Sequence, residues 1–265
     1  MRSHGTKLGQ NFLKSRNTAR RIAESAQISR QDEILEVGPG RGILTEELLA
    51  RAKRVVAVEK DAVLITTLRE KFASELTRGQ LTLVEKDILK FEPTTEGLLP
   101  GKYKIVANIP YYLTSHFLRK MLEAKCPPQN MTLTIQKEVA ERICAKPPHM
   151  NLLALSVQIF GSPKIAFKIS KREFAPAPKV DSAVINISDI SREFFSAHKI
   201  NEQKFFEIVK SGFAQKRKVL INNLCRQQKI KKDRMESIFA KCEIPLKARA
   251  ENLEIAHWIC LYKNL

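Results

Sequence analysis

Four short apolar stretches in the first half of the chain each end on a loop that carries glycine or a polar side chain. They alternate with segments of helical spacing and span residues 33–37, 54–58, 81–85 and 103–106. Strands that alternate with helices are typical of a parallel sheet flanked by helices. Because ligands of such open α/β sheets bind at the carboxyl ends of the strands, we expect a binding site at these four loops.

The loop after the fourth stretch carries the sequence Asn108-Ile109-Pro110-Tyr111. The side-chain oxygen of Asn108 and the carbonyl of Ile109 can each accept a hydrogen bond from an amino group, and Pro110 stiffens the turn. Tyr111 offers a ring on which a base can stack. The sequence therefore predicts a pocket for the exocyclic amino group of adenine. Taken alone, these four residues favour a strand end with core aromatics, and the loops that precede them reverse that interpretation.

The loop after the first stretch contains Gly38, Gly40 and Gly42 at alternate positions. This spacing differs from the dinucleotide-binding fingerprint, and the Gly-Lys-Ser/Thr of a nucleotide-triphosphate loop does not follow. Glycines let a ligand approach the backbone closely. Glu36, just before the loop, is an acceptor suited to the ammonium group of an amino acid.

The second and third stretches lead to the carboxylates Glu59 and Asp87, and one helix over 61–76 is expected between them. Glu59 is placed to bind the hydroxyls of a ribose, and Asp87 to accept from the amino group of an adenine. Each acid alone could be a surface residue or a helix cap. With the glycine loop and Asn108, they predict an adenosine that carries an amino-acid group, namely S-adenosylmethionine. No metal site is expected.

The second half of the chain changes character near residue 190. Residues 163–169 and 182–187 alternate and predict a hairpin at the sheet edge, joined by a proline-stiffened segment that begins at Phe174. Phe174 could form a second wall of the base pocket or belong to the core. Beyond residue 190 only helical spacing remains, which predicts a methyl-transfer domain over 1–190 and a helical domain over 191–265.

The charge of the chain is concentrated at its two ends. The formal net charge is +18, with seven Lys/Arg against one Glu in residues 1–30, 23 against 19 acids in 31–190, and 16 against eight in 191–265. A polyanion that contacts both ends would explain this distribution. Lys216-Arg217-Lys218 is expected to open a helix and to contact phosphate, although a solvated surface would show the same charges.

Other features of the composition point to a cytoplasmic protein. No run of 18 apolar residues exists, and the N-terminus lacks the apolar core of a secretory signal. The five cysteines are odd in number and well separated, so we expect neither a disulfide framework nor a zinc cluster.

These motifs together resemble those of the ribosomal RNA adenine dimethyltransferases, and most closely the bacterial small-subunit type whose loss confers kasugamycin resistance. The resemblance spans nearly the whole chain and rests on residues 8–13, 36–40, 108–111, 136–140, 178–184, 216–218 and 249–253. Residues 146–153 lack the Tyr-Gly-Arg-Leu pattern expected there, which concerns local RNA contacts rather than the reaction.

The resemblance implies a class I S-adenosylmethionine-dependent methyltransferase fold, with a mostly parallel seven-stranded sheet and a small helical C-terminal domain. It implies transfer of two methyl groups to N6 of each of two adjacent adenosines in the 3′-terminal hairpin loop of 16S rRNA, within an immature small subunit. The implied cofactor-binding residues are Asn11, Leu13, Gly38, Glu59, Asp87 and Asn108. Tyr111 and Phe174 match the aromatics that hold the target base, beside Asn108 as the catalytic amide.

Three other functions remain open from the sequence. A large-subunit rRNA dimethyltransferase of the macrolide-resistance type is disfavoured by residues 216–218 and 249–252. A DNA adenine methyltransferase would more usually carry a second proline where Ile109 stands. An assembly or transcription factor that binds nucleic acid, with methylation incidental, is weakened by the intact pocket. We expect a monomer.

Overall fold

The computed structural model of the protein describes residues 11–265, so Leu8-Gly9-Gln10 of the N-terminal motif lies outside the described residues. The chain forms two compact units. The first reaches to Ala140 and includes Ser162–Ile190, and the second combines Glu141–Gly161 with Ser191–Leu265. The end of the first unit coincides with the expected boundary near residue 190, but the grouping of 141–161 with the C-terminal helices was not anticipated. That each unit is an independent domain stays a prediction.

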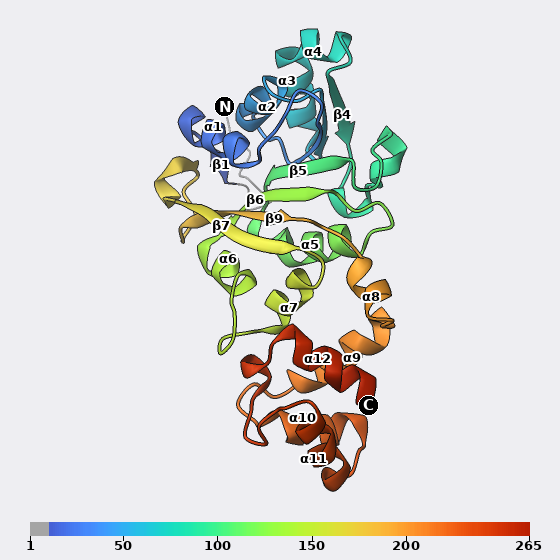
Figure 1. The fold of residues 1–265 in the computed structure, drawn as a ribbon. Coiled ribbons are helices and arrows are strands. Elements are labelled where there is room, and N and C mark those ends of the chain that lie inside the picture. Colours follow the sequence, from blue (N-terminus) through green and yellow to red (C-terminus); the bar gives the residue numbers. More distant parts are fainter. Residues whose placement is uncertain (1–10) are drawn as a thin grey trace. The chain divides into compact units, whose positions relative to one another are not determined.

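A seven-stranded sheet forms the centre of the first unit, in the order β4-β3-β2-β5-β6-β9-β7. Five of its strands, β4, β5, β6, β9 and β7, are labelled in Figure 1. Its strands are β2 (Glu33–Val37), β3 (Arg54–Glu59), β4 (Leu81–Glu85), β5 (Tyr103–Asn108), β6 (Asn130–Gln136), β7 (Ser162–Ile169) and β9 (Ser182–Ser188). From β4 to β6 the neighbours run parallel, and β9 pairs antiparallel with both β6 and β7. The predicted mostly parallel sheet and its edge hairpin are confirmed.

Helices α2 (Ile43–Leu49), α3 (Ala62–Lys71), α4 (Ala73–Thr77) and α5 (Thr114–Glu123) lie between the parallel strands in the chain. Helix α1 (Arg16–Ser25) precedes β2, and α6 (Lys137–Ile143) follows β6 and crosses the boundary between the two units. The carboxylate of Asp61 caps α3 by accepting from the amides of Val63 and Leu64. The single helix expected over 61–76 is wrong, because α3 ends before Phe72. That ring is buried against Gly42, where an added Cβ would come within 2.6 Å of it.

A second, two-stranded sheet joins distant parts of the first unit. Strand β1 (Phe12–Leu13) pairs antiparallel with β8 (Phe174–Ala175), so that Phe12 faces Ala175 and Leu13 faces Phe174. The amide of Lys14 continues the pairing by donating to the carbonyl of Glu173 at 2.9 Å. The N-terminal segment and the proline-stiffened connector are therefore held side by side.

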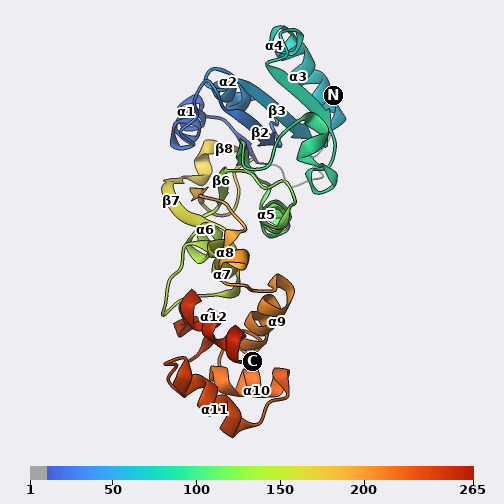
Figure 2. The same cartoon turned by 45° about the vertical axis from the view of Figure 1, so that its right-hand side comes forward.

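The second unit is helical (Figure 2). Its helices are α7 (Leu152–Gln158), α8 (Glu193–Ala197), α9 (Glu202–Gly212), α10 (Leu220–Gln228), α11 (Lys232–Lys241) and α12 (Ile255–Asn264). Lys216-Arg217-Lys218 was expected to open a helix, but these residues lie in the turn before α10, which begins at Leu220. In neither unit is any described helix long and apolar enough to cross a membrane.

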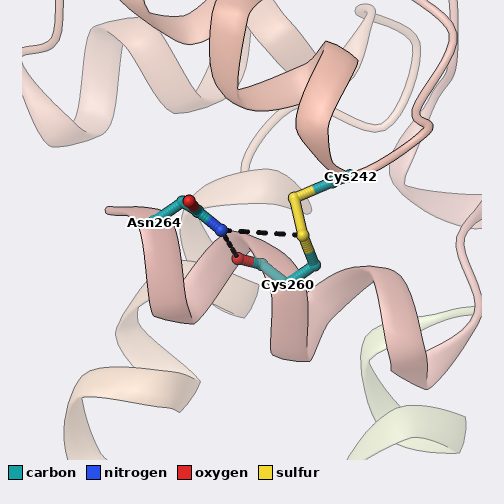
Figure 3. The surroundings of a disulfide bond; sticks show 3 residues. All are labelled: Cys242, Cys260 and Asn264. Atoms are coloured by element: carbon teal, nitrogen blue, oxygen red, sulfur yellow. Dashed lines mark hydrogen bonds between the residues drawn. A yellow bond between two sulfur atoms is a disulfide. The ribbon is translucent and has the colours of Figure 1, made fainter.

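A disulfide joins α11 to α12 (Figure 3). Cys242, at the end of α11, is bonded to Cys260, and the amide of Asn264 donates to the Cys260 carbonyl at 2.9 Å. The sequence predicted no disulfide framework, and this bond was not anticipated. Spacing along the chain could not reveal it, because the bond depends on two helices packing with both thiols at their contact.

Reduction of this disulfide should lower the unfolding free energy by about 3 kcal/mol, as estimated for closing a loop of this length. The two cysteines are 18 positions apart. Urea unfolding followed by circular dichroism, with and without dithiothreitol, would measure the difference. A Cys242→Ser/Cys260→Ser variant should match the reduced protein, and Cys225→Ser is the control. Equal midpoints for oxidised and reduced protein would contradict the prediction.

Candidate functional site

A cavity of about 180 Å³ opens at the carboxyl ends of β2, β3, β4 and β5. Seven of the eight residues predicted from the sequence line it: Asn11, Gly38, Glu59, Asp87, Asn108, Tyr111 and Phe174. The eighth, Leu13, lines a smaller hollow that also contains Gly38, Asn108 and Glu36. The loops of four successive strands thus meet at one edge of the sheet, as their positions in the sequence indicated.

The Asn108 side chain is held in one orientation at the end of β5. Its Nδ2 donates to the backbone carbonyl of Asn11 at 3.1 Å. A carbonyl can only accept a hydrogen bond, so the amide nitrogen of Asn108 must face Asn11. The side-chain oxygen is then directed away from Asn11 and can accept from a ligand. The next residue is fixed as well, because the Ile109 amide donates to the Thr134 carbonyl at 3.2 Å.

Two aromatic side chains from different parts of the chain line the same cavity. Tyr111 begins a short turn of 3₁₀ helix, Tyr111–Leu113, and Phe174 is a buried residue of β8. The Tyr111 hydroxyl lies 2.7 Å from the Ser182 hydroxyl. Burial raises the pKa of Tyr111. Phe174 contributes to the cavity wall and also belongs to the hydrophobic core, so both alternatives open from the sequence hold.

Glu36 carries a buried carboxyl group without a hydrogen-bond partner for its Oε2. Burial, followed by the nearby charge of Glu59, raises the pKa of Glu36 to about 8. A buried acceptor without a partner favours a ligand that brings a donor. The ammonium group of an amino acid brings donors for this oxygen, and its positive charge would favour the ionised carboxylate, so the structure fits the ligand group expected next to the glycine loop.

The raised pKa of Glu36 should make the protein less stable as the pH rises. Between the unfolded-state value of 4.5 and about 8, the unfolded chain has released a proton that the folded chain retains. In that window the unfolding free energy of the wild type should fall relative to that of Glu36→Gln. The difference between the two should grow by on the order of 1 kcal/mol for each pH unit. Urea unfolding at pH 5, 6.5 and 8 would measure this. A constant difference would contradict it, and Glu33→Gln serves as the control.

Glu59 has a role in the structure that the sequence did not suggest. Its Oε1 accepts from the amides of Lys60 and Asp61 at 2.8 and 3.0 Å, and its Oε2 accepts from the amide of Gly40 at 3.3 Å. The carboxylate therefore ties the end of β3 to the glycine loop after β2. Gly40 has a φ of +58°, and an added Cβ would lie 2.9 Å from the Phe12 ring, so loop and N-terminal segment are closely packed.

Asp87 closes the side of the cavity beyond β4. It accepts from the Leu89 amide at 3.0 Å and from the Lys60 ammonium group at 3.0 Å. These interactions lower the pKa of Asp87, with the Leu89 amide first, so it is a carboxylate at neutral pH. Sequence reasoning missed Lys60, which lines the cavity, although it directly follows Glu59. It also assigned no role to Ser182, although this residue lies in the motif of residues 178–184 on which the resemblance rests.

The described residues contain no group of three or more His, Cys, Asp or Glu side chains arranged to hold a metal ion. The cavity is lined by carboxylates, amides, lysines, aromatic rings and backbone groups. This set can bind an ammonium group, a ribose and an adenine, and can accept hydrogen bonds from a second amino group beside Asn108.

Comparison with known proteins places these features in context. Residues 1–265 match the family model described as ribosomal RNA adenine dimethylase. The chain is 40% identical to ribosomal RNA small subunit methyltransferase A of Dehalococcoides mccartyi over 96% of this chain and 86% of that protein. It is also 40% identical to the protein of the same name from Fusobacterium nucleatum, over 98% of this chain and 97% of that one.

Two solved structures are similar over nearly the whole chain. A dimethyladenosine transferase from Plasmodium falciparum has a TM-score of 0.78 and 25% identity, covering 94% of this chain and 95% of that one. The 23S rRNA methyltransferase ErmE has a TM-score of 0.76 and 28% identity, covering 96% of this chain and 99% of that one.

Proposed function

The chain belongs to the ribosomal RNA adenine dimethylase family, and we propose that it dimethylates N6 of two adjacent adenosines in the 3′-terminal hairpin loop of 16S rRNA. It is an S-adenosylmethionine-dependent rRNA adenine dimethyltransferase with a class I methyltransferase fold. The finer statement, which names the nucleotides and the subunit, rests on the resemblance of its motifs to the small-subunit type.

The observation that carries the proposed chemistry is the fixed orientation of Asn108. The Asn11 carbonyl holds the amide nitrogen at 3.1 Å, which leaves the side-chain oxygen to accept from N6 of the target adenosine. The Ile109 carbonyl would accept the second N6 hydrogen. Two acceptors on one amino group favour a more tetrahedral nitrogen, whose lone pair is less delocalised into the ring. Such preorganised dipoles lower the barrier without reorganising during the reaction.

When bound, S-adenosylmethionine supplies an electrophilic methyl group carried on a positively charged sulfur. The target base must leave its stack to reach the cavity. Tyr111 and Phe174 would hold the base there by stacking, with Asn108 as the catalytic acceptor. The displaced proton can leave to water, so no general base is required at N6. For the second transfer, the pocket must accept a methyl group where it held a hydrogen.

The cofactor would be held by the residues at the ends of β2, β3 and β4. Glu36 would accept from its ammonium group and Glu59 from its ribose hydroxyls, while Asp87 would accept from its adenine amino group. The remaining proposed contacts are Asn11, Leu13, Gly38 and Asn108. The partnerless oxygen of Glu36 and the close packing of the glycine loop support this arrangement.

We extend the proposal to the setting in which the enzyme acts. Its substrate would be the 16S rRNA of an immature small subunit, and it would work in the cytoplasm as a monomer. The excess of Lys and Arg in residues 191–265 supports a contact between the second unit and rRNA phosphates. Lys216-Arg217-Lys218, which are exposed in the turn before α10, are the proposed contact.

Incubation with labelled S-adenosylmethionine and small subunits from a strain that lacks the modification would test the proposal. Digestion of the rRNA and separation of its nucleosides should give N6,N6-dimethyladenosine from the 3′-terminal hairpin. Label in large-subunit RNA or in DNA instead would show that the enzyme is one of the rival methyltransferases and would contradict the proposal. Tight particle binding without any label would favour an assembly factor. Small subunits that already carry the modification are the control and should take up no label.

A further inference from the structure

The Tyr111 ring is anchored at both of its ends. Its backbone is fixed by the turn after Pro110, whose carbonyl accepts from the Leu113 amide at 2.9 Å. Its hydroxyl, at the far end of the ring, lies 2.7 Å from the Ser182 hydroxyl. A ring held only at its backbone could pivot about its side-chain torsions, whereas a second contact across the ring restricts that motion.

Ser182 is a rigid anchor because of its place in the sheet. It is fully buried and is the first residue of β9, opposite Gln136 of β6 and Ile169 of β7. A buried hydroxyl needs a hydrogen-bond partner, and in this structure the partner is Tyr111. The antiparallel end of the sheet thus reaches across to the loop after β5, which carries the acceptors for the target base.

We propose that Ser182 is a positioning residue, which fixes the plane of the Tyr111 ring so that the stacked target adenine presents N6 to Asn108. The inference rests on the proposed function and adds to it a residue that does not touch the base. Stacking is tolerant of small displacements, but the two acceptors are fixed, so a tilted base would lose alignment with them. Ser182 therefore acts through the geometry of the ring rather than through binding.

A double-mutant cycle on unmethylated small subunits would test this. Ser182→Ala and Tyr111→Phe should each lower kcat roughly tenfold, about the value of one neutral hydrogen bond. The KM for the particle should stay unchanged. The double variant should be no slower than either single variant, because both changes remove the same bond. Independent losses that multiply in the double variant, or a Ser182→Ala enzyme with the wild-type kcat, would overturn the proposal.

Two controls separate this test from other failures. Ser188→Ala makes the same change at the opposite end of β9, where the hydroxyl contacts Asp189, and should retain the wild-type kcat. Titration with S-adenosylmethionine measures the fraction of each variant that is folded. The kcat of each variant is then calculated for the folded protein only. If the wild type does not methylate the small subunit, the proposed function fails. If it does and Ser182→Ala equals Ser188→Ala, only the positioning role fails.

Discussion

Replacing Asn108 with alanine should reduce methyl transfer to rRNA by about 10²–10³-fold, the loss found when one preorganised group is removed from a reacting centre. Binding of S-adenosylmethionine should weaken by less than about tenfold, because the substitution removes only one neutral hydrogen bond to the cofactor. The Asn108 amide is fixed by the Asn11 carbonyl, so its oxygen is poised for a ligand before one binds. Single-turnover rates and calorimetric titration would measure the two quantities separately.

A second substitution at this position tests the orientation itself. Asn108→Asp keeps the acceptor but loses the donor to Asn11, and sets a negative charge against a carbonyl, so it should be nearly as slow as the alanine variant. Asn201→Ala truncates the same side chain at the cap of α9, outside the cavity, and is the matched control. Equal losses of rate and of cofactor affinity in Asn108→Ala would contradict a role on the target nitrogen.

Replacing Trp258 with alanine should lower the unfolding free energy of the second unit by about 3–5 kcal/mol. The indole is fully buried and stacks on Phe213 with a centroid distance of 5.6 Å. It also packs on Gly212, where an added Cβ would lie 2.4 Å from the ring. Urea unfolding monitored by circular dichroism would measure the loss.

The same variant tests whether the two units unfold separately. Every residue that lines the cavity belongs to the first unit, so Trp258→Ala should still bind S-adenosylmethionine under conditions that unfold the second unit. Loss of cofactor binding in the same transition would instead mean one cooperative domain. Leu246→Ala, which truncates an exposed side chain of the second unit, should change the unfolding free energy by less than about 0.5 kcal/mol.

The sequence predicted the loops of the site because strand order dictates them. Parallel strands bring their carboxyl ends to one edge, so Gly38, Glu59, Asp87 and Asn108 could be placed together without a structure. Leu13 falls beside the main cavity rather than in it, although its hollow shares Gly38 and Asn108 with that cavity.

Contacts between segments far apart in the chain could not be predicted from it. The bond between Tyr111 and Ser182 depends on the position of β9 between β6 and β7, and the Cys242–Cys260 bond depends on the packing of two helices. The break at Phe72 could not be read from local spacing, which favours a continuous helix, whereas the Phe72 ring packs on Gly42 of a distant loop.

The pairing of β1 with β8 has a consequence for how the enzyme is made. Synthesis begins at the N-terminal side, yet β1 finds its partner only when Phe174 and Ala175 have been added. Closing so long a loop is slow and becomes favourable only after the strands between have paired. The segment that carries the Asn11 carbonyl is therefore docked late, and with it the orientation of Asn108. A chain still on the ribosome, shorter than this point, would hold every cofactor-facing carboxylate and yet have no finished pocket for the base.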